Sequence, residues 1–250
     1  SVVLGSGRDL AGEFCKAMRE AGLKRGFYFS MLEYANPQYP GGRDSKRTEA
    51  SLSIADWNRF VNFPQLKDLA DRYEADIIWP DGEWDYTGDE HGSAGFLAWL
   101  YNDSKVKDTV VVNDRWGKDT RGRHGGHYTT EYGHGASAIK DTGVMHPWEE
   151  CRGIGGSFGY NQFETTEHYM SRSRCIRTLV STVSRGGNLL LNVGPDADGR
   201  IPAIMEDRLL AIGEWLKVNG DAIYATTRAN IKSNDKDVYL TAKGDKLYVI

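Results

Sequence analysis

Short apolar runs alternate with longer amphipathic stretches along most of this chain. Helices are predicted where apolar residues recur every three or four positions, over residues 10–23, 63–73, 94–101, 175–184 and 204–218. Strands are predicted where strand-forming residues gather in short runs, over residues 25–32, 77–79, 109–112, 126–132 and 188–193. Polar residues follow the strands. This order is typical of either a β/α barrel or a doubly wound parallel sheet, although a closed barrel needs eight strands.

The stretches between these elements predict loops, and the last part of the chain has a different pattern. Irregular connections are expected over residues 33–62, 85–92, 118–150 and 153–160, which are rich in Gly, Pro and polar residues. Residues 230–250 alternate apolar and polar positions around a turn at 243–245, which predicts the start of an all-β domain. We therefore expect a catalytic domain over 1–225 and a second domain over 226–250. We also expect these 250 residues to be an internal piece of a longer enzyme.

The stretch from Ile77 to Trp84 contains the first candidate for chemistry. Ile77, Ile78 and Trp79 predict a strand buried on both faces. Pro80 should end that strand, since proline has no N–H to donate, and Asp81-Gly82 is a turn signal. Asp81 is then placed at the carboxyl end of a buried strand, where α/β barrels build their active sites. The alternative is an ordinary turn with a solvated carboxylate.

Two further segments carry candidate residues. Arg115 lies in Asn113-Asp114-Arg115-Trp116-Gly117, just after the predicted strand 109–112. Its planar guanidinium suits either a sugar hydroxyl or carboxylate, or an Asp partner that fixes the loop. Glu131 lies in an aromatic, Gly-rich segment, where desolvation would favour the protonated acid that a general acid requires. The alternative is a plain loop glutamate.

Composition and charge remove several classes of function. Hydrophobic content is 40% and charged content 26%, as in ordinary globular proteins. The net charge of −4, from 31 basic and 35 acidic residues, argues against a nucleic-acid partner. No apolar run is long enough to span a membrane. The seven Trp and thirteen Tyr are compatible with a sugar site, but cores and interfaces also collect aromatic residues.

Metal, acyl-transfer and disulfide chemistry are not supported by the motifs present. The three cysteines form no CxxC pair, and the one GxSxG match, at 155–159, lies in a predicted irregular stretch and not between a strand and a helix as a nucleophile elbow requires. Five of the six histidines are candidate ligands, but they match no compact ligand spacing and no HExxH motif; they are His91, His124, His127, His134 and His146. We expect no metal and no cofactor.

Eight segments, in order, resemble the family 29 α-L-fucosidases, which are retaining glycosidases. The resemblance covers residues 8 to about 228. The most specific segments are GGNLLLNVGP at 186–195 and WLKVNGDAIY at 215–224. The other segments are GFYFS at 26–30, WPDG at 79–82, VNDRWG at 112–117, TEY at 130–132, SFGYN at 157–161 and DGRIP at 198–202.

The resemblance implies a fold and a set of site residues. The implied fold is an α/β (β/α)8-like TIM barrel, here incomplete with about five strands, followed by a β-sandwich. Asp81 falls at the nucleophile, and Glu131 where some members place the acid/base. Positions that line the fucose pocket correspond to Tyr28, Trp79, Arg115 and Phe158. Phe158 would pack on the methyl group of the sugar, and Arg115 would hold a polar atom near the ring.

The implied activity is hydrolysis of a terminal α-L-fucose from a glycan or small fucoside, through a glycosyl-enzyme ester on Asp81. Retention needs two carboxyl groups about 5–5.5 Å apart. Family members also carry, upstream of the part that corresponds to Asp9, histidines and a Glu-Trp pair that hold fucose hydroxyls. Their absence from this sequence leaves a second interpretation, an inactive or fucose-binding remnant. A third is a retaining glycosidase for another sugar.

Location and assembly are less constrained by the sequence. The resemblance implies a secreted, periplasmic or lysosomal type of location, although residues 1–5 lack the layout of a signal peptide. Unpaired strand edges in an incomplete barrel would favour pairing with another chain. A homo-oligomer is therefore one expectation.

Overall fold

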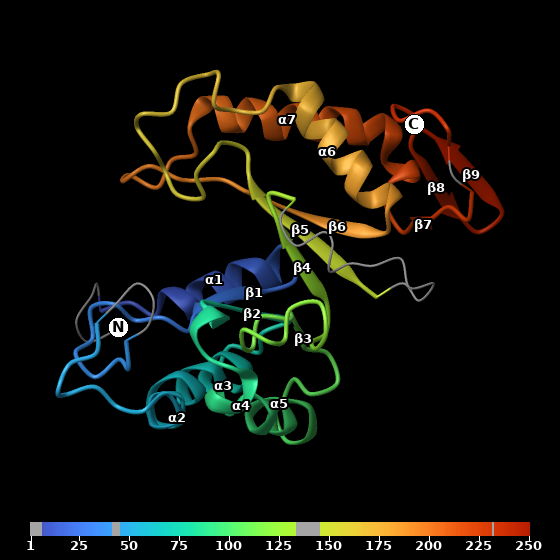
Figure 1. Ribbon diagram of the computed structural model, residues 1–250. Coiled ribbons are helices and arrows are strands. Elements are labelled where there is room, and N and C mark those ends of the chain that lie inside the picture. The colour runs from blue at the N-terminus through green and yellow to red at the C-terminus, as the bar shows by residue number, and fades with distance from the viewer. Residues whose placement is uncertain (1–6, 42–45, 134–145, 232) are drawn as a thin grey trace. The chain divides into compact units, whose positions relative to one another are not determined.

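The computed structural model describes residues 7–41, 46–133, 146–231 and 233–250. His134 lies outside the described residues. The chain divides into two compact units, residues 1–128 and 129–250. Each unit has a small sheet and helices of its own (Figure 1).

The sheet of the first unit is parallel and has three strands in the order β1-β2-β3. They are β1 (Gly26–Ser30), β2 (Ile77–Asp81) and β3 (Val111–Val112). In the β1–β2 register Tyr28 pairs with Trp79 and Ser30 with Asp81. Because the strands are parallel, their carboxyl ends meet at one edge of the sheet.

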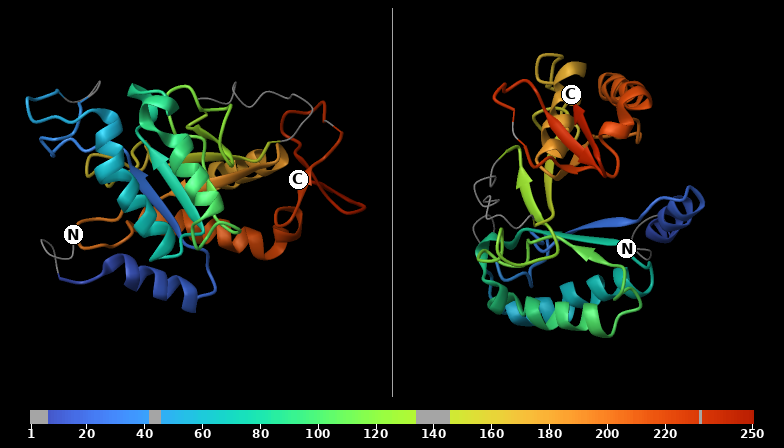
Figure 2. Two further views of the ribbon diagram at one scale, coloured as in Figure 1. Left: turned by 90° about the horizontal axis from the view of Figure 1, so that it is seen from below. Right: turned by 90° about the vertical axis from the view of Figure 1, so that its right-hand side faces the viewer.

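Helices cover this sheet, and α3, α4 and α5 lie on one side of it (Figures 1 and 2). The helical elements are α1 (Leu10–Glu20), α2 (Ile54–Trp57), the π-helix η1 (Asn58–Asn62), α3 (Phe63–Asp71), the 3-10 turn η2 (Glu83–Asp85), α4 (Gly88–His91) and α5 (Ser93–Asn102). Asp9 caps α1 by accepting a hydrogen bond from the Gly12 N–H at 3.0 Å. Between α3, α5 and the sheet lies an apolar core that includes Leu66, Ile78, Phe96 and Leu100.

The second unit contains a sheet in the order β4-β5-β6, from β4 (Tyr128–Glu131), β5 (Trp148–Gly153) and β6 (Gly187–Asn192). β5 and β6 run parallel. The helices are α6 (Arg172–Ser184), α7 (Ala203–Asn219) and the 3-10 turn η4 (Gly220–Ala222). A third, antiparallel sheet follows, from β7 (Thr227–Arg228), β8 (Leu240–Lys243) and β9 (Lys246–Val249).

The predicted helices and strands are all present, with ends that differ by a few residues. Three of the predicted loops, residues 33–62, 85–92 and 118–150, are wrong in part. Residues 33–62 contain α2 and η1, and residues 85–92 contain α4. β5 was missed because its WEECRG sequence has no apolar run, although Trp148, Glu150 and Cys151 are buried.

The prediction that β2 ends before Pro80 is also wrong, because β2 continues to Asp81. The Ile77 N–H donates to the Arg25 carbonyl on the β1 side, so the N–H and C=O groups of odd-numbered residues in β2 point towards β1. Those of the even-numbered residues in β2 point towards β3. β3 pairs only with Ile77 and Ile78. Pro80 therefore faces a position where no ladder donor is needed, and its carbonyl accepts a bond from Asn113 Nδ2 at 3.0 Å.

The mixed α/β class is confirmed, while the incomplete barrel and the domain boundary at 225/226 stay predictions. Residues 226–250 do form the strands and the turn expected there. Over the described residues, no helix has the length and apolar character needed to cross a membrane.

Candidate active site

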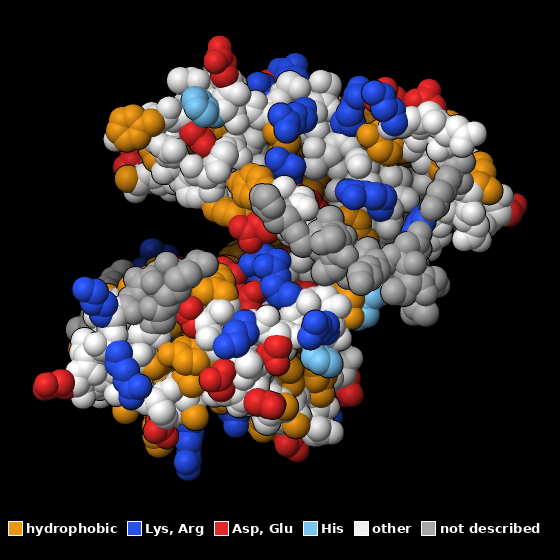
Figure 3. All heavy atoms as spheres, viewed as in Figure 1, with side chains coloured by type: hydrophobic (Ala, Val, Ile, Leu, Met, Phe, Trp, Pro, Cys, Tyr) orange, Lys and Arg blue, Asp and Glu red, His pale blue; other side chains and the backbone are white. Residues whose placement is uncertain are grey.

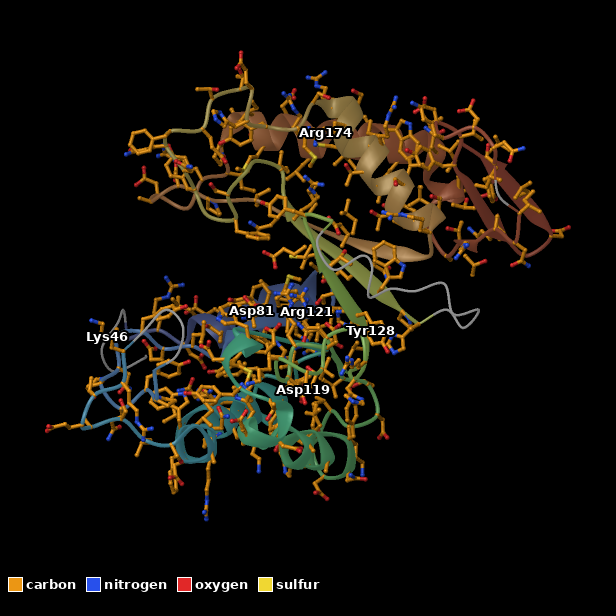
Figure 4. The ribbon with its side chains drawn as sticks, viewed as in Figure 1. Lys46, Asp81, Asp119, Arg121, Tyr128 and Arg174 are labelled. Carbon is orange, nitrogen blue, oxygen red and sulfur yellow. The ribbon has the colours of Figure 1, made fainter. Side chains whose placement is uncertain are left out.

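Asp81 is the last residue of β2 and lies at the carboxyl end of the first sheet (Figure 4). The next residue, Gly82, has a φ of 89°, in the left-handed region that favours glycine. A Cβ atom at Gly82 would lie 2.5 Å from Cγ of Leu32. The turn after Asp81 therefore depends on glycine for two reasons, and it fixes the direction in which the carboxylate leaves the strand.

Both oxygens of the Asp81 carboxylate accept a hydrogen bond. Tyr28 donates its hydroxyl to Oδ2 at 2.9 Å, and Arg115 donates Nη1–H to Oδ1 at 2.5 Å. The Asp81 side chain is 19% exposed, so it remains open to solvent on one side. The contacts hold the carboxylate in one orientation, and the guanidinium stabilises its negative charge.

Arg115 is buried, with only 2% of its side chain exposed. Its guanidinium lies over the Trp79 ring, 4.4 Å from the ring centroid. Asn113 connects this segment to the end of β2, since its Oδ1 accepts the Arg115 N–H and its Nδ2 donates to the Pro80 carbonyl, each at 3.0 Å. A buried cation needs such compensation, and here an anion and an aromatic face both provide it.

Two aromatic rings complete this group. Tyr28 and Trp79 stack with 5.9 Å between ring centroids and 28° between ring planes. Desolvation raises the pKa of the Tyr28 phenol, even though 63% of the residue is exposed, and the Asp81 carboxylate raises it further. Tyr28 is therefore neutral at physiological pH and remains a hydrogen-bond donor to Asp81.

Glu83 is a buried carboxyl close to this group that the sequence did not single out. It is 2% exposed, and its Oε1 lies 3.8 Å from Nε of Arg121. Burial raises the pKa of Glu83, and the positive charges of Arg115 and Arg121 oppose that shift. The only sequence signal was its position two residues after Asp81, in a turn where exposure is the usual expectation.

Glu131 and Phe158 belong to the second unit. Glu131 is the half-buried last residue of β4, and Tyr132 after it has a φ of 48°, which turns the chain. The Tyr132 ring meets the Phe158 ring edge to face, with 5.2 Å between centroids. The Tyr132 hydroxyl accepts the Gly153 N–H at 3.1 Å, and Asn192 Nδ2 donates to the Phe158 carbonyl at 2.5 Å.

The structure therefore brings together four of the six predicted site residues, Tyr28, Trp79, Asp81 and Arg115, in the first unit. Glu131 and Phe158 lie in the second unit. Tyr132, which lies in the TEY segment at 130–132 but has no role predicted from sequence, connects the end of β4 with Phe158. Its positive φ and its hydroxyl contacts depend on the tertiary structure and leave no sequence signal.

A metal role is not indicated by the described part of the chain. Within it, no three His, Cys, Asp or Glu side chains come together as metal ligands would. His91 is instead buried against Asn58, whose Nδ2 lies 2.9 Å from Nδ1 of the histidine.

A carboxylate at the carboxyl end of parallel strands, held by an arginine beside stacked aromatic rings, is an arrangement that suits a glycoside hydrolase. The family model described as alpha-L-fucosidase matches residues 1–221. The chain belongs to the alpha-L-fucosidase family.

Relatives in animals and an amoeba share this similarity. The tissue alpha-L-fucosidase of Bos taurus is 43% identical over 251 residues, which is 99% of this chain and 51% of that protein. The alpha-L-fucosidase of Dictyostelium discoideum is 40% identical over 242 residues, covering 96% of this chain and 51% of that protein. The chain thus spans about half the length of these relatives.

Solved structures of bacterial enzymes are similar as well. The Thermotoga maritima alpha-fucosidase in complex with fucose has a TM-score of 0.76 and 34% sequence identity, over 98% of this chain and 54% of that one. The alpha-L-fucosidase isoenzyme 1 of Paenibacillus thiaminolyticus has a TM-score of 0.80 and 28% identity, over 97% of this chain and 60% of that one.

Proposed function

We propose that this chain carries the nucleophile side of a retaining α-L-fucosidase that hydrolyses terminal α-L-fucose from glycans or small fucosides. The observation that carries the proposal is the Asp81 carboxylate at the end of β2, held by Tyr28 and Arg115. Family membership supports fucose as the sugar, since the named relatives are fucosidases and one solved relative holds fucose. The comparisons favour neither the remnant nor a glycosidase for another sugar.

In the first step of the proposed reaction, Asp81 attacks the anomeric carbon. One carboxylate oxygen forms the new C–O bond while the bond to the leaving oxygen breaks, and that oxygen takes a proton from Glu131. Tyr28 and Arg115 orient the Asp81 carboxylate for this attack, with one donor on each oxygen.

In the second step, Glu131 takes a proton from water, which attacks the same carbon and releases Asp81. Two displacements at one carbon leave the product with the configuration of the substrate. The position of Glu131 at the end of β4 supports its role as acid/base. Trp79, Tyr28 and Phe158 supply apolar surface for the sugar, and Phe158 is 38% exposed and open to a methyl group.

The test is the Asp81→Gly variant with an aryl α-L-fucoside. Removing the nucleophile should lower kcat at least about a thousandfold. Added azide should restore turnover and give a fucosyl azide of inverted configuration, because azide then occupies the vacated space and makes the only displacement. Asp108→Gly is the matched control, since Asp108 is an exposed residue of the same unit. If Asp81→Gly hydrolyses the fucoside at the wild-type rate, the assignment fails.

A further inference from the structure

A polar groove lies in the second unit between β4, β5 and α6. It has a volume of about 330 Å³. Its lining includes four arginines, Arg152 from β5 and Arg174, Arg177 and Arg185 from α6. Figure 3 shows basic side chains along α6, and Figure 4 labels Arg174. The volume falls at the lower end of the range for small-molecule sites.

The composition of this groove is unusual for its place in the fold. Where a helix packs on a parallel sheet, the facing side chains are normally apolar. Here the strands contribute Thr130, Glu150 and Arg152 to the lining. The helix contributes Arg174, Thr178, Ser181 and Arg185, whose spacing of four, three and four residues places them on one face of α6.

The charges in the groove are only partly compensated. Nη1 of Arg177 pairs with Asp237 at 3.1 Å, and Nε of Arg185 donates to the Ser181 carbonyl at 3.0 Å while the guanidinium lies over the Trp148 ring. The Glu150 carboxylate is already engaged, by the Thr130 hydroxyl and by the Gly133 N–H at 2.9 Å. Among the residues that the structure describes, the groove therefore retains an excess of positive charge.

Arg152 shows most directly that an acceptor belongs here. Its Nε atom is buried and has no hydrogen-bond partner among the described residues. Its guanidinium lies over the Tyr132 ring, 5.1 Å from the centroid. A desolvated guanidinium N–H without an acceptor is costly, and an anion in the groove would remove that cost.

We propose that this groove binds a tetrahedral oxyanion, sulfate or phosphate, either as the free ion or as the ester of a sugar. Arginine forks match the oxygens of such an anion better than other side chains do. The site is separate from the proposed chemistry, because Thr130 lines the groove and successive strand residues face opposite sides of a sheet. Glu131 therefore faces away from the groove, and the proposal does not rest on fucosidase activity.

The test is isothermal titration calorimetry of the chain at constant ionic strength, with chloride as the reference salt. Sulfate, phosphate and glucose 6-phosphate are titrated separately, and glucose serves as the uncharged counterpart. Saturable binding of at least one anion, with none for glucose, is expected. Tighter binding of glucose 6-phosphate than of phosphate identifies a sugar ester as the ligand, and equal or weaker binding identifies the free ion.

Variants locate the binding. Arg152→Gln and Arg174→Gln should each weaken anion binding at least about tenfold, because each removes a charged donor. Arg200→Gln is the matched control, since this substitution removes the same charge at an exposed position outside the groove. Arg174 is exposed, so its substitution keeps the test valid if Arg152→Gln does not fold. Equal affinities in all three variants and the wild type, or no anion heat above chloride, would overturn the proposal.

Discussion

Asp81 is defined by its neighbours as much as by its place in the chain. Its position at a strand end was predictable, because an apolar run followed by Pro-Asp-Gly limits where the strand can stop. The donors on its two oxygens were not, since Tyr28 lies 53 positions and Arg115 34 positions away. The alternatives left open for Arg115, a ligand for substrate or a partner for an Asp, are partly resolved, because Arg115 does pair with an aspartate, Asp81 at the end of β2.

Replacing Tyr28 with Phe tests the donor to Asp81. The ring stack on Trp79 is retained, while the hydroxyl that donates to Oδ2 is lost. A hydrogen bond to a charged group contributes about 1.5–3 kcal/mol, so kcat/KM for an aryl fucoside should fall about tenfold or more. Tyr101→Phe, on α5 of the same unit, should leave it unchanged. A Tyr28→Phe enzyme with wild-type kcat/KM would show that this contact has no part in the reaction.

At the scale of elements, the turn after β2 is a position that only glycine fits. Gly82→Ala places a methyl group in the left-handed region and against the Leu32 side chain. The backbone conformation alone costs about 1–3 kcal/mol, and the contact adds to it. Chemical denaturation should therefore show a larger loss of stability than in Gly22→Ala, where φ is 67° and nothing lies within 4 Å of the added atom. Equal losses in the two variants would mean that the Leu32 contact is unimportant.

The contact between α4 and η1 makes the stability of the first unit depend on pH. His91 is 2% exposed, its Nε2 has no hydrogen-bond partner among the described residues, and burial lowers the pKa of His91 to about 4. The nearby carboxylates of Asp85, Glu90 and Asp119 oppose this shift but are outweighed. The folded state therefore keeps His91 neutral at a pH where the same histidine in the unfolded chain, with a pKa of about 6.5, takes up a proton.

The unfolded state binds more protons in this range, so stability falls as the pH is lowered from about 6.5 towards 4. Between pH 7 and 5 the His91 contribution to the free energy of unfolding should decrease by about 2 kcal/mol. Denaturation at both pH values measures it, and His91→Gln should remove that part of the dependence while leaving the rest. The same pH dependence in the variant as in the wild type would contradict this origin.

At the same scale, the helices and most strands follow from the periodicity of apolar residues. β5 does not, because Glu150 and Arg152 replace apolar residues where a buried strand normally has them. Glu150 is buried only because Thr130 and Gly133 supply its hydrogen bonds. A strand whose polar groups are satisfied by its neighbours cannot be recognised from its own sequence.

For the whole molecule, the proposed reaction requires a second carboxyl group, and Glu131→Gly tests that role. Loss of the acid should slow hydrolysis of an alkyl fucoside, whose leaving group needs a proton, about a thousandfold. A dinitrophenyl fucoside, whose leaving group departs without one, should lose far less in the first step. Steady-state and pre-steady-state rates separate the two effects. Glu167→Gly, at an exposed position of the same unit, is the control.

Equal losses with both substrates in Glu131→Gly would assign the acid to another residue. Azide provides an independent readout, since rescue of a missing acid/base gives a fucosyl azide of retained configuration, opposite to that expected from Asp81→Gly. The two variants together thus distinguish the nucleophile from the acid by the stereochemistry of one product.

The sequence by itself determined the mixed α/β class, the position of Asp81 at a strand end and the family, because these depend on local periodicity and on short ordered segments. Only the tertiary structure decided which side chains hold the Asp81 carboxylate, that Glu83 is buried, and that four arginines share one groove. These features depend on contacts between residues far apart in the chain. Burial and pairing of charges change with such contacts, and no local pattern encodes them.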